Sequence, residues 1–260
     1  MSADESTHLE GLARYRDELA HLKSALDVAF GPNVRNNPNA LEDRVVFPLG
    51  VATRDLCEEV IWFGHQGFGI AALRTARTLY ECVVFSLYIN KHPETWKVYL
   101  HQMYAQWASV LRNVPGAALR LPQMHKDLSE NVPAYSKGKV IPLDWNNDRT
   151  TRKMAKDVGI SDIFHSLAFN YTSGFVHPSG MFLLSMFTRS MKDGALLIGV
   201  KKQDEEWKMA AQITHDMTIN AIRLRLKYSD SPALWGSLDV CEKDFVAIWN
   251  YPPQLTTQGA

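Results

Sequence analysis

The stretch from Phe68 to Asn90 is apolar on almost every side of a helix, and Arg74, Arg77 and Glu81 are its only charged residues. A helix with a single apolar stripe can lie at a surface, whereas one that is apolar all round must be covered on every side. The sequence therefore predicts that this helix lies at the centre of a helical bundle. With 260 residues, the chain is long enough to enclose such a core.

Apolar residues at helical spacing recur along most of the chain, and proline or glycine separates the segments. We predict an all-α fold, a multi-helix bundle in a single domain. Residues 1–40 are expected to form an N-terminal helix and loop, residues 41–250 the bundle domain, and residues 251–260 a flexible tail. The individual helices are expected over residues 6–30, 45–63, 68–90, 94–113, 149–158, 161–176, 179–191, 204–228 and 238–250.

The bundle pattern fails in a Pro-containing excursion at about residues 114–144. One short helix is expected inside it, near Gln123 to Glu130. The excursion is typical either of a lid or binding loop or of a surface insertion. Farther along, Ala195 to Lys201 is compatible with a short strand pair or with a loop.

Composition excludes several classes of protein. Lys plus Arg and Asp plus Glu both number 28, so the formal net charge is zero, unlike that of a generally basic nucleic-acid binder. The three cysteines lie far apart in apolar helical stretches and indicate reduced thiols of a cytoplasmic protein. We see no signal peptide, membrane span, metal site, cofactor motif or DNA-specific motif.

Arg74, Arg77 and Glu81 are spaced i, i+3 and i+7, so they share one face of the central helix. Burying charges is costly unless they are paired and hydrogen-bonded. Two interpretations remain open. The face either is partly solvated and braces the bundle, or it lines a polar pocket.

A second polar face precedes Pro178, where Asn170, Ser173 and His177 are again spaced i, i+3 and i+7 and Tyr171 flanks them. A histidine at a helix C-terminus is favoured by the unpaired carbonyls there. His177 therefore either caps the helix or belongs to a functional site. In contrast, we interpret the run of Arg223, Arg225 and Lys227 as a solvated face, with RNA phosphates as an alternative contact.

The two faces and the residues between them resemble a family of bacterial helical proteins known only as a domain of unknown function. The resemblance covers roughly Leu49 to Phe187, and its most specific part is the segment from Tyr171 to Ser179. The residues that carry it are Arg77, Glu81, Tyr88, Ile89, Trp145, Arg152, Lys153, Met154, Ala155, Tyr171, Ser173, His177, Pro178 and Ser179.

This arrangement is in turn similar to the HEPN superfamily, helical bundles that often act as ribonucleases in toxin–antitoxin and phage-defence systems. The resemblance implies an arginine four to six residues before a histidine near a helix end, usually in a dimer cleft. This chain departs from the pattern, because Tyr171, Thr172 and Ser173 stand at those positions before His177. Arg74 or Arg77 would have to reach His177 from the neighbouring helix.

Three functions follow as expectations. The first is an uncharacterised HEPN-like protein with a polar pocket for an unknown ligand or partner, in which Arg74, Ser173, Tyr171 and Asn170 bind the ligand. The second is a metal-independent ribonuclease of a toxin or defence system, with His177, Arg77 and Glu81 as catalytic residues and RNA as substrate. The third is a structural or regulatory interaction protein that forms a homodimer. Whether the protein is an enzyme stays open at this point.

Overall fold

The computed structural model describes residues 15, 19–32, 34, 41–113, 116–131, 150–176, 187–189, 196–198 and 204–253. Their contacts divide the chain into two compact units, whereas the sequence indicated a single domain. The first unit comprises residues 1–90 and 151–260, and the second comprises residues 91–150. The domain boundaries at residues 41 and 250 stay a prediction.

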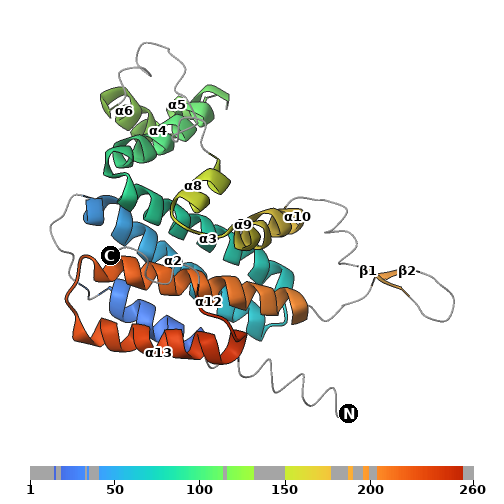
Figure 1. The fold of residues 1–260 in the computed structure, drawn as a ribbon. Helices are drawn as coiled ribbons and strands as arrows, with labels where there is room; N and C mark the ends of the chain where they lie inside the picture. The colour runs from blue at the N-terminus through green and yellow to red at the C-terminus, as the bar shows by residue number, and fades with distance from the viewer. Residues whose placement is uncertain are drawn as a thin grey trace. The chain divides into compact units, whose positions relative to one another are not determined.

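The first unit is a bundle in which α12 (Asp204–Leu226) packs against α2 (Phe47–His65) and α13 (Pro232–Trp249) (Figure 1). A π-helical turn, η1 (Glu42–Val46), leads into α2. Residues 213–222 of α12 are buried without interruption, so neighbours cover this helix on all sides. The predicted all-α bundle is confirmed.

The helix predicted at the centre, α3 (Gly69–Lys91), exposes only Thr78 and Lys91. All its other residues are buried or half-buried. This pattern agrees with the prediction from its apolar sequence.

Polar side chains fill much of the buried part of α12. Thr214, His215, Asp216, Thr218 and Asn220 all lie in its buried stretch. The interpretation of the nearby arginines as a solvated face was wrong, because the whole Arg225 residue is only 2% exposed. The sequence did not predict the central position of α12 in the bundle, because its polar residues lower its hydropathy. Hydropathy alone does not reveal the partners that satisfy buried polar groups.

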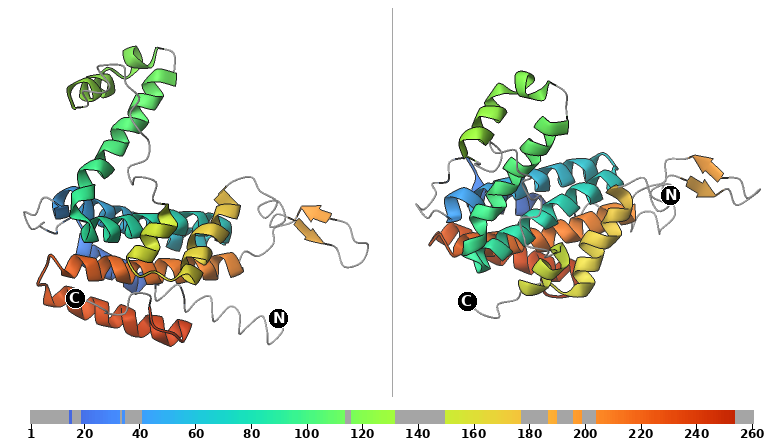
Figure 2. Two further views of the ribbon diagram at one scale, coloured as in Figure 1. Left: turned by 45° about the horizontal axis from the view of Figure 1, so that its top comes forward. Right: turned by 90° about the horizontal axis from the view of Figure 1, so that it is seen from above.

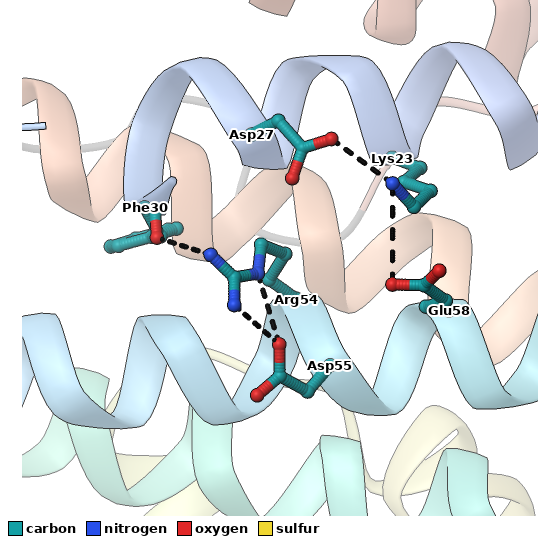
Figure 3. Close-up of polar contacts among 6 residues, drawn as sticks. All are labelled: Lys23, Asp27, Phe30, Arg54, Asp55 and Glu58. Carbon is teal, nitrogen blue, oxygen red and sulfur yellow. Dashed lines mark hydrogen bonds and ion pairs between the residues drawn. The ribbon is translucent and has the colours of Figure 1, made fainter. Parts of the chain in front are cut away.

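The N-terminal helix, described over residues 19–30, packs inside the first unit. Figure 3 shows the polar contacts that join it to α2, where Arg54 donates from Nη1 to the Phe30 carbonyl at 2.9 Å. Arg54 also contacts Asp55, and Lys23 bridges Asp27 and Glu58. The sequence had set residues 1–40 apart from the bundle.

Two buried carbonyl groups end this N-terminal helix, and an arginine satisfies each of them. Arg225 Nε of α12 donates to the Ala29 carbonyl at 3.1 Å, one residue before the Phe30 carbonyl that Arg54 binds. The last carbonyls of a helix lack partners within the helix, and cations are favoured at that end. The two arginines therefore fix the C-terminal end of the helix against α2 and α12.

Short helices follow the second unit in sequence and lie beside α3 (Figure 2). They are α8 (Thr151–Asp157), α9 (Asp162–His165), the π-helix η3 (Ser166–Tyr171) and α10 (Thr172–Val176). The predicted cap is confirmed, because Ser161 Oγ accepts from the Phe164 N–H at 3.2 Å.

A two-stranded antiparallel hairpin precedes α12, formed by β1 (Phe187–Arg189) and β2 (Leu196–Ile198). The strand alternative for Ala195 to Lys201 is confirmed for β2 alone, because its partner β1 lies outside that range. The helix predicted over residues 179–191 was wrong at its end, since β1 lies there. Two strands that pair with each other override a local helical pattern.

The second unit contains η2 (Pro93–Thr95), α4 (Trp96–Asn113), α5 (Ala117–Arg120) and α6 (Pro122–Asn131). Both α5 and α6 pack against α4. The short helix predicted near Gln123 is confirmed. The excursion is thus partly helical, and residues 132–149 lie outside the described part of the chain.

The last helix, α13, is longer than predicted and begins at Pro232 with Ser231 as its N-cap. It ends at Asn250, whose φ of 58° is left-handed and typical of a helix C-cap. Within the described ranges, no helix is both long enough and apolar enough to cross a membrane.

Candidate functional site

Three contacts join α3 to the segment from α9 to α10. Tyr80 Oη lies 2.7 Å from His165 Nδ1, Arg77 Cζ lies 4.3 Å from the centre of the Phe169 ring, and Arg74 Nε donates to the Phe175 carbonyl at 2.6 Å. Residue numbers fall along α3 as they rise along the second segment, so the two run antiparallel. The two polar faces of the sequence therefore belong to neighbouring segments.

Arg74 binds the main chain near the end of α10. The Phe175 carbonyl is one of the last four carbonyl groups of this segment, and these receive no hydrogen bond from within the helix. The guanidinium supplies the donor that this carbonyl needs. This hydrogen bond gives Arg74 a structural role in holding α10 beside α3.

Arg77 is a largely buried cation whose hydrogen-bonding capacity is unmet. Its side chain is 15% exposed, and both Nε and Nη1 are buried without a hydrogen-bond partner among the described residues. Nε lies 3.9 Å from Glu81 Oε2, which is an ion pair but too long for a hydrogen bond. The face of Phe169 offers a cation–π contact in place of an acceptor. Buried side-chain nitrogens without a hydrogen-bond partner are rare in folded proteins, and among the described residues this guanidinium has two of them.

Glu81, the partner of Arg77, keeps its proton more readily than an ordinary glutamate. Burial raises the pKa of its carboxyl group, and the positive charge of Arg77 opposes that shift. Its side chain is 29% exposed, so it lies between the core and solvent. The pair therefore joins a fixed cation to a half-buried carboxyl group.

Tyr80 and His165, which were not predicted from the sequence, form a hydrogen bond in the core. Tyr80 Oη lies 2.7 Å from His165 Nδ1, and which of the two donates depends on the tautomer of the histidine. Burial raises the pKa of the Tyr80 phenol. Burial also lowers the pKa of His165, with a smaller contribution from Arg152. The available signal was a polar side chain in each of two apolar helices, because buried polar groups need partners.

The remaining predicted residues of this segment do not form one polar face. Asn170 is exposed, and Ser173 donates from its hydroxyl to the Phe169 carbonyl at 2.5 Å. Tyr171 is half-buried and packs edge-on against Phe175, and burial raises its pKa. The π-helix η3 has wider turns than an α-helix, so α-helical spacing does not hold across it.

His177 lies outside the described residues. The predicted meeting of its imidazole with Arg77 and Glu81 therefore stays a prediction. Among the described residues, no group of three or more His, Cys, Asp or Glu side chains could hold a metal ion. The three cysteines are free, as predicted, with Cys57 and Cys241 buried and Cys82 half-buried.

Comparison with known proteins gives one match. No curated protein and no solved structure matches the chain. A family model, the Family of unknown function (DUF5677), matches residues 43–195, which is more than half of the chain and contains α3, the segment from α9 to α10, and the contacts between them. The chain belongs to this family, DUF5677.

Proposed function

We propose that the protein is a HEPN-like helical protein that binds a ligand or partner at a polar site centred on Arg77 and Glu81. The observation that carries the proposal is the Arg77 guanidinium, whose Nε and Nη1 are buried and have no hydrogen-bond acceptor in the part of the chain that the structure describes. Leaving a buried charged donor unpaired is costly, and folded proteins rarely do so without a reason. A bound acceptor would remove that cost.

The chemistry of the pair favours an oxyanion as the bound group. Guanidinium binds phosphate and carboxylate through charge-assisted hydrogen bonds. Glu81 lies 3.9 Å from Arg77 Nε and would orient the guanidinium toward such an oxygen. In this proposal Ser173, Tyr171, Asn170 and Arg74 flank the ligand, and His177 completes the site.

Replacing Arg77 with methionine should weaken binding of inorganic phosphate to the purified protein about tenfold or more, because the charge-assisted hydrogen bonds are lost. Isothermal titration calorimetry at constant ionic strength would measure the affinity. The matched control is Arg54→Met, since the Phe30 carbonyl and Asp55 already occupy that guanidinium. Equal affinity of the wild type and Arg77→Met, or no binding by the wild type, contradicts the proposal.

The double variant Arg77→Met with Glu81→Leu separates binding from a structural role. A buried ion pair replaced by apolar residues of similar size is often tolerated or even stabilising. If the pair serves a ligand, the double variant should fold normally and lose phosphate binding. Should it instead lose stability or homodimerisation while phosphate has no effect on the wild type, the structural or regulatory interaction protein is the better description.

Ribonuclease activity is the second candidate, and it draws on the position of Arg74. This arginine holds the Phe175 carbonyl, two residues before His177 in the sequence. In this mechanism His177 is the general acid or base, Arg77 stabilises the charge that develops on the phosphate, and Glu81 orients either group. No metal takes part, and the function would lie in a bacterial toxin or phage-defence system.

For the ribonuclease, total RNA incubated with the wild type and a metal chelator should be cleaved, and His177→Ala should leave it intact. Gel electrophoresis of the RNA reports the result. The exposed His65 supplies a matched control, His65→Ala, which should cleave like the wild type. RNA that stays intact with the wild-type protein excludes this candidate.

A further inference from the structure

We infer that Tyr80, His165 and Phe169 are positioning residues that set the orientation of the Arg77 guanidinium. The inference uses the same site as the proposed function and adds the residues that hold its cation. It concerns the protein without ligand, so it can be tested whether or not phosphate binds.

The four side chains form a continuous chain of contacts between two segments. Tyr80 Oη lies 2.7 Å from His165 Nδ1, and the His165 ring stacks on Phe169 with 5.2 Å between centres and 16° between planes. Phe169 in turn lies 4.3 Å from Arg77 Cζ. Among the described residues, Arg77 Nε and Nη1 have no hydrogen-bond partner, so the Phe169 ring and the Glu81 carboxylate at 3.9 Å are the contacts that hold the guanidinium. A rotation of that ring would therefore move the cation.

The hydrogen bond between Tyr80 and His165 holds the imidazole in place. A phenol can donate or accept, so the contact forms with either tautomer of the ring. Because Phe169 stacks on the His165 ring, loss of this hydrogen bond would free the ring to turn and would remove support from Phe169.

The Nε–H signal of Arg77 in nuclear magnetic resonance tests the inference directly. In ¹⁵N-labelled protein, Arg77→Lys identifies the signal by its loss. The proton should be protected from solvent and shifted upfield by the Phe169 ring. Arg223 is an internal control, because its Nε donates to Glu242 at 2.8 Å and neither residue takes part in the contacts described above.

Three conservative variants separate positioning from packing. Tyr80→Phe keeps the ring but removes the hydroxyl, and it should reduce the upfield shift of the Arg77 signal. His165→Phe keeps a ring that can stack on Phe169 but loses the hydrogen bond, and it should behave similarly. His165→Asn can keep a hydrogen bond to Tyr80 but removes the stacked ring, and it should also reduce the shift. The Arg223 signal should stay unchanged in all three.

An Arg77 signal that is unshifted or unprotected in the wild type overturns the inference, as does one that is unchanged in Tyr80→Phe and His165→Phe. These results differ from those that test the proposed function. A wild type with the expected Arg77 signal but no phosphate binding contradicts the proposed function alone. Phosphate binding together with an Arg77 signal that ignores Tyr80 and His165 contradicts this inference alone.

Discussion

Replacing Phe30 with alanine should lower the free energy of unfolding by about 3–5 kcal/mol, the usual cost of emptying a large aromatic site in a core. Phe30 is 1% exposed and is the last residue of the described N-terminal helix. Its ring fills the space over Gly50 of α2, where an added Cβ would overlap it, and it contacts Phe47 at 5.8 Å between ring centres. Neither α2 nor this helix can move in to fill the cavity, because Arg54 and Arg225 fix the end of the helix.

Urea unfolding followed by circular dichroism would measure the effect. Phe68→Ala is the matched control, since Phe68 is 52% exposed and its loss should change the free energy of unfolding by less than about 1 kcal/mol. A Phe30→Ala variant as stable as Phe68→Ala would show that residues 19–30 do not belong to the cooperative core. The separate N-terminal element indicated by the sequence would then be the better description.

Acid should destabilise the protein through His215 by about 3 kcal/mol between pH 6.5 and pH 4. Burial lowers the pKa of this histidine from 6.5 to about 4. Its ring is neutral in the folded protein, where Nε2 donates to the Cys241 carbonyl at 3.1 Å and Nδ1 accepts from Trp249 Nε1 at 3.3 Å. Above pH 6.5 the ring is neutral in both states. As the pH falls below 6.5, the His215 imidazole becomes protonated in the unfolded chain but stays neutral in the folded one. The free energy of unfolding therefore decreases until the pH reaches the folded pKa of about 4.

The measurement is the free energy of unfolding as a function of pH for the wild type and His215→Gln. Glutamine offers one donor and one acceptor but does not titrate, so its stability should fall less steeply between pH 6.5 and pH 4. His65→Gln, which removes an exposed histidine, should follow the wild-type curve. Identical slopes for wild type and His215→Gln would mean that His215 is not buried and neutral in solution.

The candidate site could be predicted from the sequence only in part. Arg74, Arg77 and Glu81 stood out because charges on an apolar helix have few explanations, and the structure places them beside the predicted second segment. Which side chains meet them was not predictable. Phe169, Tyr80 and His165 are ordinary residues of a helical core in the sequence, and the wider turns of η3 moved Asn170 to the surface.

The sequence by itself determined the helical class of this protein, the buried character of α3 and many helix ends, because periodicity, proline and capping residues act locally. Only the tertiary structure decided that polar α12 is buried on all sides, that Arg225 lies in the core, and that residues 19–30 complete the bundle. Each depends on partners distant in sequence, such as Ala29 for Arg225 and Cys241 for His215. A buried polar group is stable only when such a partner meets it, and no local pattern specifies which residue that is.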